Sequence, residues 1–79
     1  MYYVYILRSF KSGKFYIGST SDIKRRLQEH NSDQSRYTRL RGPWKLIYLE
    51  KKPCLAEARI RERFLKTGDG RKTVKNLLR

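Results

Sequence analysis

The sequence predicts an α/β (α+β) domain in which a small three-stranded antiparallel sheet is flanked by helices, in the order β-β-α-β-α-α. Three observations support this fold class. Short runs of aromatic and β-branched residues alternate with longer segments of helical period. Turn residues such as glycine and proline separate these segments. The chain has only 79 residues, so we expect residues 1–79 to form a single domain.

The first two strands are expected to form a hairpin. Residues 2–7 are rich in aromatic and β-branched side chains on both faces, which is typical of a central strand covered on both sides. Residues 11–14 have the composition of a turn. Residues 15–18 would then form the second strand, antiparallel to the first.

The first helix is expected from Ile23 to about His30. Residues 19–22 precede it and supply hydroxyl and carboxylate groups for an N-cap. Ile23 and Leu27 lie one helical turn apart, so both should face the sheet. Residues 31–42 are polar and basic without a clear period, and we interpret them as a surface loop.

The second half of the chain predicts one strand and two helices. The strand covers residues 44–49, and a longer helix covers residues 55 to about 66. Gly68 is expected to end that helix. Asp69 can then cap a last helix over residues 71–78.

Composition indicates a polyanionic partner. Lys and Arg number 20 against 7 Asp and Glu, which gives a net charge of +13 with histidine neutral. Nucleic acid is the first partner that such a charge favours, and an anionic membrane the second. Cys54 is the single cysteine, which excludes an internal disulfide framework and a cysteine-based zinc cluster. The apolar runs are too short to span a bilayer, so we expect a cytoplasmic domain. No basic amphipathic helix is clear enough to favour a membrane surface, so no membrane partner is expected.

The long helix places one carboxylate in an unusual setting. Glu62 falls within a stripe formed by Leu55, Ala58 and Leu65. The basic residues of the neighbouring arc are Arg59, Arg63 and Lys66. A carboxylate among apolar side chains needs a cation or a hydrogen-bond donor. A salt bridge to Lys66 at i+4, which spacing alone favours, and a metal ligand are the two interpretations.

Two further groups of residues remain. Tyr3 and Tyr5 share one face of the first strand, and Tyr16 and Gly18 share one face of the second. The residues at i, i+4 and i+8 of the first helix are Asp22, Arg26 and His30. Taken one at a time, the tyrosines would be ordinary sheet core, and Asp22 and Arg26 a surface pair. The seven carboxylates are dispersed, so a site with two metal ions is not expected.

Taken together, this ordered set resembles the GIY-YIG endonuclease superfamily. The likeness rests on the tripeptides at residues 3–5 and 16–18, followed by Arg26, His30 and Glu62. It runs from residue 2 to at least residue 66. The chain length and the run at residues 42–48 are similar to the small stand-alone bacterial members, in contrast to homing endonucleases and excision-repair enzymes.

The resemblance implies an endonuclease that hydrolyses phosphodiester bonds in nucleic acid, with DNA favoured over RNA, in repair or recombination. It implies a single Mg²⁺ or Mn²⁺ ion held by Glu62. The catalytic residues would be Tyr5, Tyr16, Arg26, His30 and Glu62. The nucleic-acid-binding residues would be Gly18, Lys24, Arg25, Arg59, Arg63, Lys66 and Asn76. Arg26 would contact the scissile phosphate, and Gly18 would allow close approach of the backbone.

The resemblance and elementary chemistry suggest a division of labour. Tyr5 is expected to be the base, Tyr16 to position the water, and His30 to relay or accept the proton. We expect a strongly positive site to lower the pKa of Tyr5. Tyr3 replaces the first glycine of the family motif, which would crowd the site or change substrate choice. The alternative is a catalytically weak or inactive nucleic-acid-binding module of the same fold.

Overall fold

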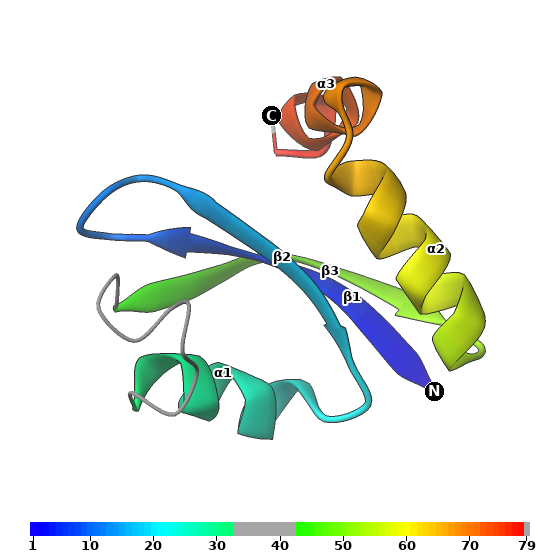
Figure 1. The fold of residues 1–79 in the computed structure, drawn as a ribbon. Helices are drawn as coiled ribbons and strands as arrows, with labels where there is room; N and C mark the ends of the chain where they lie inside the picture. Colours follow the sequence, from blue (N-terminus) through cyan, green and yellow to red (C-terminus); the bar gives the residue numbers. More distant parts are fainter. Residues whose placement is uncertain (33–42, 79) are drawn as a thin grey trace.

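The computed structural model of the protein describes residues 1–32 and 43–78. Its elements follow the order β-β-α-β-α-α, which confirms the predicted α+β fold class (Figure 1). The strands are β1 (Tyr2–Ser9), β2 (Phe15–Thr20) and β3 (Trp44–Lys52). The helices are α1 (Ile23–Asn31), α2 (Leu55–Leu65) and α3 (Gly68–Leu77). Most of the predicted loop, residues 33–42, lies outside the described residues.

The three strands form one antiparallel sheet in the order β2-β1-β3. The central position of β1 agrees with the apolar side chains on both of its faces. Helix α1 covers one face of the sheet, and α2 and α3 lie on the other (Figure 1). Each strand extends two or three residues beyond its predicted end, because backbone pairing continues past the last apolar residue. Strand β2 is left at an edge of the sheet.

Alternate residues of β1 build two separate cores. Val4 and Ile6 pack toward α2 and α3, in a cluster with Ala58, Leu65 and Val74. Tyr5 and Leu7 point to the opposite face. They form a cluster with Trp44, against which Tyr16, Ile23, Leu27 and Leu46 pack. The prediction that Ile23 and Leu27 face the sheet is therefore confirmed.

Helix α3 begins at Gly68, earlier than the predicted start at residue 71. The N-cap is Thr67 and not Asp69: the Thr67 hydroxyl accepts a hydrogen bond from the backbone N–H of Gly70 at 3.1 Å. A side chain at Gly70 would overlap the backbone of Phe64 and Leu65. Gly70 therefore lies inside the first turn of α3, where the missing Cβ lets this turn pack against the end of α2. Within residues 1–32 and 43–78, the helices are too short and too polar to traverse a bilayer.

Candidate active site

Tyr5 lies at the centre of a hydrogen-bonded group beneath α1. Its side chain is buried, and its hydroxyl is 3.0 Å from Nε2 of the buried His30. Nε of Arg26 donates a hydrogen bond to the same hydroxyl at 3.3 Å. Strand β1 and helix α1 thus bring together three of the predicted catalytic residues, which are separated by 21 and 25 positions in the chain.

Tyr16 and Gly18 of β2 complete this group. The ring centroid of Tyr16 lies 4.7 Å from that of His30 and 6.3 Å from that of Tyr5. Gly18 is the cross-strand partner of Tyr5. A Cβ atom at Gly18 would lie 2.5 Å from the Tyr5 hydroxyl oxygen. The space that the missing side chain leaves is therefore filled by the Tyr5 phenol.

Burial controls the protonation of this group. Burial raises the pKa of Tyr5 to about 12, although the hydrogen bond from Arg26 opposes this shift. Burial and the positive charge of Arg26 lower the pKa of His30 to about 4. Tyr5 and His30 are thus both neutral near pH 7. The expected lowering of the Tyr5 pKa is wrong, because the loss of water around the phenol outweighs the nearby positive charge.

Arg26 is held in place from two sides. Its Nη1 donates to Oε1 of Glu29 at 2.9 Å, and its Nε donates to Tyr5. The hydrogen bond with Tyr5 raises the pKa of Arg26, so the guanidinium stays charged. The expected pair of Arg26 with Asp22 is wrong, because Asp22 caps α1 by accepting from the backbone N–H of Arg25 at 3.1 Å.

Glu62 approaches from α2, on the other face of the sheet. Its Oε1 accepts a hydrogen bond of 2.6 Å from the Ser19 hydroxyl, and its Oε2 accepts one of 2.7 Å from Nζ of Lys66. Burial acts to raise the pKa of Glu62, but the hydrogen bonds from Lys66 and Ser19 hold it below its usual value. The salt bridge to Lys66 is therefore present, and Glu62 is ionised at neutral pH.

The hydrogen bond from Ser19 to Glu62 was not predicted from the sequence. Ser19 pairs with Val4 in the sheet, so it faces α2, whereas its neighbour Gly18 faces α1. The alternation of side chains along a strand could have signalled this position, because Ser19 directly follows the tripeptide at residues 16–18. Its hydroxyl fixes one oxygen of Glu62 beside the edge of β2.

The two groups meet across β2. Tyr5, Tyr16, Arg26 and His30 lie on the α1 side, whereas Glu62 lies on the α2 side. The negative charge of Glu62 contributes to the raised pKa of Tyr5, so the two sides interact electrostatically through the strand. The arrangement places a charged guanidinium, a relay of neutral hydroxyl and imidazole groups, and a carboxylate around one exposed edge.

Glu62 is the residue of the site that could coordinate a divalent metal ion. Within the described residues, no three His, Cys, Asp or Glu side chains gather closely enough to enclose one. Mg²⁺ commonly uses one or two protein carboxylates and completes its shell with water and substrate phosphate. Glu62 fits this pattern, since it is ionised and already binds a cation, the Lys66 ammonium group. Glu62 would hold the ion, which would supply Lewis-acid chemistry.

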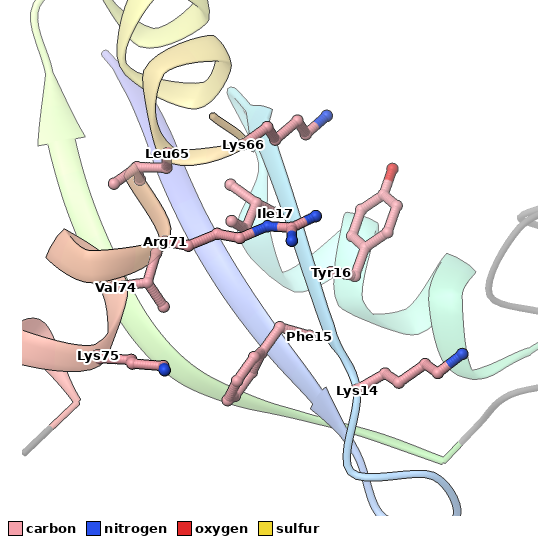
Figure 2. Close-up of a pocket in the computed structure, with 9 residues that line it drawn as sticks. All are labelled: Lys14, Phe15, Tyr16, Ile17, Leu65, Lys66, Arg71, Val74 and Lys75. Carbon is pink, nitrogen blue, oxygen red and sulfur yellow. The ribbon is translucent and has the colours of Figure 1, made fainter. Parts of the chain in front are cut away.

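The predicted nucleic-acid contacts divide into those near the site and those away from it. Arg59, Arg63 and Lys66 line a hollow of about 240 Å³ together with Glu62. Lys24 and Arg25 are exposed on α1. Asn76 is exposed near the end of α3, and it lines neither this hollow nor the larger groove beside β2. That groove, shown in Figure 2, has a volume of about 700 Å³ and was not predicted.

The chain is similar to small bacterial proteins of the UPF0213 group. The chain is 37% identical over 75 residues to a UPF0213 protein of Staphylococcus saprophyticus, covering 94% of this chain and 90% of the relative. It is 45% identical over 65 residues to a UPF0213 protein of Streptococcus pneumoniae, covering 81% of this chain and 65% of that longer relative. The solution NMR structure of a UPF0213 protein from Bacillus halodurans matches with a TM-score of 0.59 and 36% identity, covering 98% of this chain and 85% of that one.

The family assignment follows from the match that covers most of the chain. A model of the GIY-YIG catalytic domain matches residues 1–75. This range includes both tyrosine motifs, Arg26, His30 and Glu62, which are the residues that our sequence analysis singled out. The protein therefore belongs to the GIY-YIG family, and its fold is that of the catalytic domain of these nucleases.

Proposed function

We propose that the protein is a divalent-metal-dependent endonuclease that hydrolyses phosphodiester bonds in nucleic acid, with DNA favoured as substrate. The observation that carries the proposal is the chain of contacts from Arg26 through Tyr5 to His30, set across β2 from Glu62. A positive charge for the phosphate, a path for a proton and a carboxylate for Mg²⁺ or Mn²⁺ are the groups that phosphodiester hydrolysis needs.

Arg26 would bind the non-bridging oxygens of the scissile phosphate. A guanidinium is planar and permanently charged, so it suits a tetrahedral phosphate whose negative charge grows during attack. Glu29 and Tyr5 fix its position, and its side chain is still 36% exposed. The Arg26 guanidinium is therefore held in one orientation but is still accessible to a phosphate that arrives from solvent.

Tyr5 and His30 would carry the proton of the attacking water. A free Tyr5 phenolate at pH 7 would cost about 7 kcal/mol against a pKa of about 12. Transfer of the phenolic proton to Nε2 of His30, as the phenol accepts one from water, avoids that free anion. With a pKa of about 4, His30 takes up this proton at a cost of about 4 kcal/mol at pH 7, which is less than that of the free phenolate, and its Nε2 lies 3.0 Å from the phenol oxygen. Tyr16, whose ring is tilted against those of Tyr5 and His30, would position the water.

Replacement of Glu62 by Gln tests the proposal. The glutamine carbonyl can still accept from Ser19, so the fold should survive, whereas the anionic ligand is lost. We expect Glu62→Gln to abolish Mg²⁺- or Mn²⁺-dependent cleavage of labelled DNA or RNA and to preserve binding. Glu57→Gln is the matched control, because Glu57 is exposed on the same helix. This variant should cleave as fast as the parent protein.

Arg26→Ala completes the comparison. It should lose cleavage and also weaken binding, because it removes a phosphate contact. If Glu62→Gln cleaves as fast as the parent protein at matched metal and salt, the proposed mechanism is wrong. If the parent protein binds nucleic acid but cleaves none of the substrates, the protein is instead a binding module of the same fold.

A further inference from the structure

The groove beside β2 has apolar walls that the proposed mechanism does not use. It lies between the edge strand β2 and helix α3, and Phe15, Ile17, Leu65 and Val74 contribute its apolar surface (Figure 2). Leu65 and Val74 are buried beneath it, but Phe15 is 45% exposed. A large aromatic ring is thus left accessible on an edge strand, next to a cavity of about 700 Å³.

The rim of this groove carries positive charge alone. Lys14, Lys66, Arg71 and Lys75 line it, and no carboxylate does so among the described residues. Lys66 pairs with Glu62. Within the part of the chain that the structure describes, Lys14, Arg71 and Lys75 form no ion pair. A ligand that fits must therefore carry several negative charges and also an apolar face.

Unpaired nucleotides combine these two properties. In a duplex the base faces stack on one another, and only the backbone and the base edges in the grooves are accessible, so Phe15 would gain little stacking from it. An unpaired base can stack on an aromatic side chain while lysine and arginine pair with its phosphates. The groove is also continuous with the candidate active site, since Tyr16 and Lys66 belong to both.

We propose that this groove binds an unpaired nucleotide of the substrate strand beside the scissile phosphate. The base stacks on Phe15, and the adjoining phosphates pair with Lys14, Arg71 and Lys75. The proposal rests on the proposed nuclease function, and it specifies the substrate as nucleic acid that is single-stranded next to the cleavage site. A continuous duplex would bind mainly through its backbone and leave the groove unfilled.

Phe15→Ala tests the stacking. Binding of a fluorescein-labelled single-stranded DNA, and of a duplex of the same sequence, is measured by anisotropy in EDTA, so that no cleavage occurs. We expect Phe15→Ala to weaken single-strand binding by about 5- to 150-fold, the range for loss of one stacked base. Duplex binding should change by less than about two-fold, because backbone contacts carry it. Phe10→Ala is the matched control, since Phe10 is 68% exposed and lies outside the groove.

A charge variant gives an independent measurement on α3. Lys75→Gln removes a groove cation, and Lys72→Gln removes an exposed cation of the same helix that does not line the groove. Lys75→Gln should weaken single-strand binding more than Lys72→Gln and reduce the salt slope by about one. Equal effects of the two lysine variants would overturn the proposal, as would equal effects of Phe15→Ala and Phe10→Ala.

The same variants separate this proposal from the nuclease function. If Phe15→Ala selectively loses single-strand binding but the parent protein cleaves nothing, the groove assignment holds and the nuclease function fails. If the parent protein cleaves and Phe15→Ala binds and cleaves single strands normally, the groove assignment is overturned and the nuclease function holds. Binding of anionic vesicles or of a poly-glutamate peptide that depends on Phe15 to the same degree would also overturn it.

Discussion

Acidification from pH 7 to pH 5 should destabilise the protein mainly through His30. In the folded state the pKa of His30 is about 4, against an ordinary value of 6.5 in an unfolded chain. The folded form therefore holds a neutral imidazole, and the unfolded form gains a proton once the pH falls below 6.5. Above pH 6.5 the titration of His30 does not reduce the stability of the fold. As the pH falls from 6.5 toward 4, protonation of the unfolded chain progressively lowers the free energy of unfolding.

The size of the effect follows from the two pKa values. Between pH 7 and pH 5 the linkage relation gives a loss of about 2 kcal/mol in the free energy of unfolding. Glu50 of β3 resembles Glu62: burial acts to raise its pKa, but hydrogen bonds from Tyr48, Lys52 and Arg61 hold it below the ordinary value. The contributions of both carboxylates to stability are therefore lost mainly below the ordinary carboxylate value of 4.5. The interval from pH 7 to pH 5 thus isolates the histidine. A domain of this size has little stability to spare.

Urea unfolding at the two pH values measures this loss. Trp44 is buried, so its fluorescence reports the transition. The parent protein should lose about 2 kcal/mol, whereas His30→Gln should show a much flatter dependence. Because the chain has one histidine, NMR titration of its imidazole resonances gives the folded pKa directly, even if the variant folds poorly. A midpoint near 6.5, or equal losses in parent and variant, would refute the reasoning.

Three further outcomes follow from the same contacts. Gly18→Ala should cost about 1–3 kcal/mol in urea unfolding and reduce cleavage, because the new methyl group displaces the Tyr5 ring. Tyr5→Phe should cost about 1–3 kcal/mol, because it removes the hydroxyl that is hydrogen-bonded to His30 and that accepts from Arg26. It should also abolish cleavage while DNA binding in gel-shift assays persists. Binding of the parent protein should fall steeply between low and physiological salt, and a flat dependence would contradict the charge argument.

The sequence predicted the elements that periodicity controls. The strands, their order of occurrence and the inward faces of α1 follow from alternation and from helical spacing, and the structure confirms them. The start of α3 was missed because glycine is read as a break in a helix. Gly70 instead sits in the first turn, where only contact with Phe64 and Leu65 explains it. Such a contact between elements leaves no local signal.

In the candidate site, too, the residues could be predicted from local sequence, but their contacts with other elements could not. Tyr5, Tyr16, Arg26, His30 and Glu62 could be named from the family motif, but their environments could not. The raised pKa of Tyr5 depends on burial by residues distant in the chain, and sequence reasoning from net charge predicted the opposite direction. The partner of Arg26 was also missed. Glu29, at i+3, and Asp22, at i−4, are both possible by spacing, and the demands of the N-cap decide between them.

The site can form around a single short strand because side chains alternate along it. Tyr16 and Gly18 of β2 face α1 and meet the tyrosine, arginine and histidine group, whereas Ser19 faces α2 and holds Glu62. Phe15, on the α2 and α3 side, opens into the groove. The position of β2 at the edge of the sheet allows one ligand to reach residues on both faces, because a ligand can contact both faces at once only at an edge strand. A second strand paired with the free edge of β2 would separate Arg26 from Glu62 and would also close the groove.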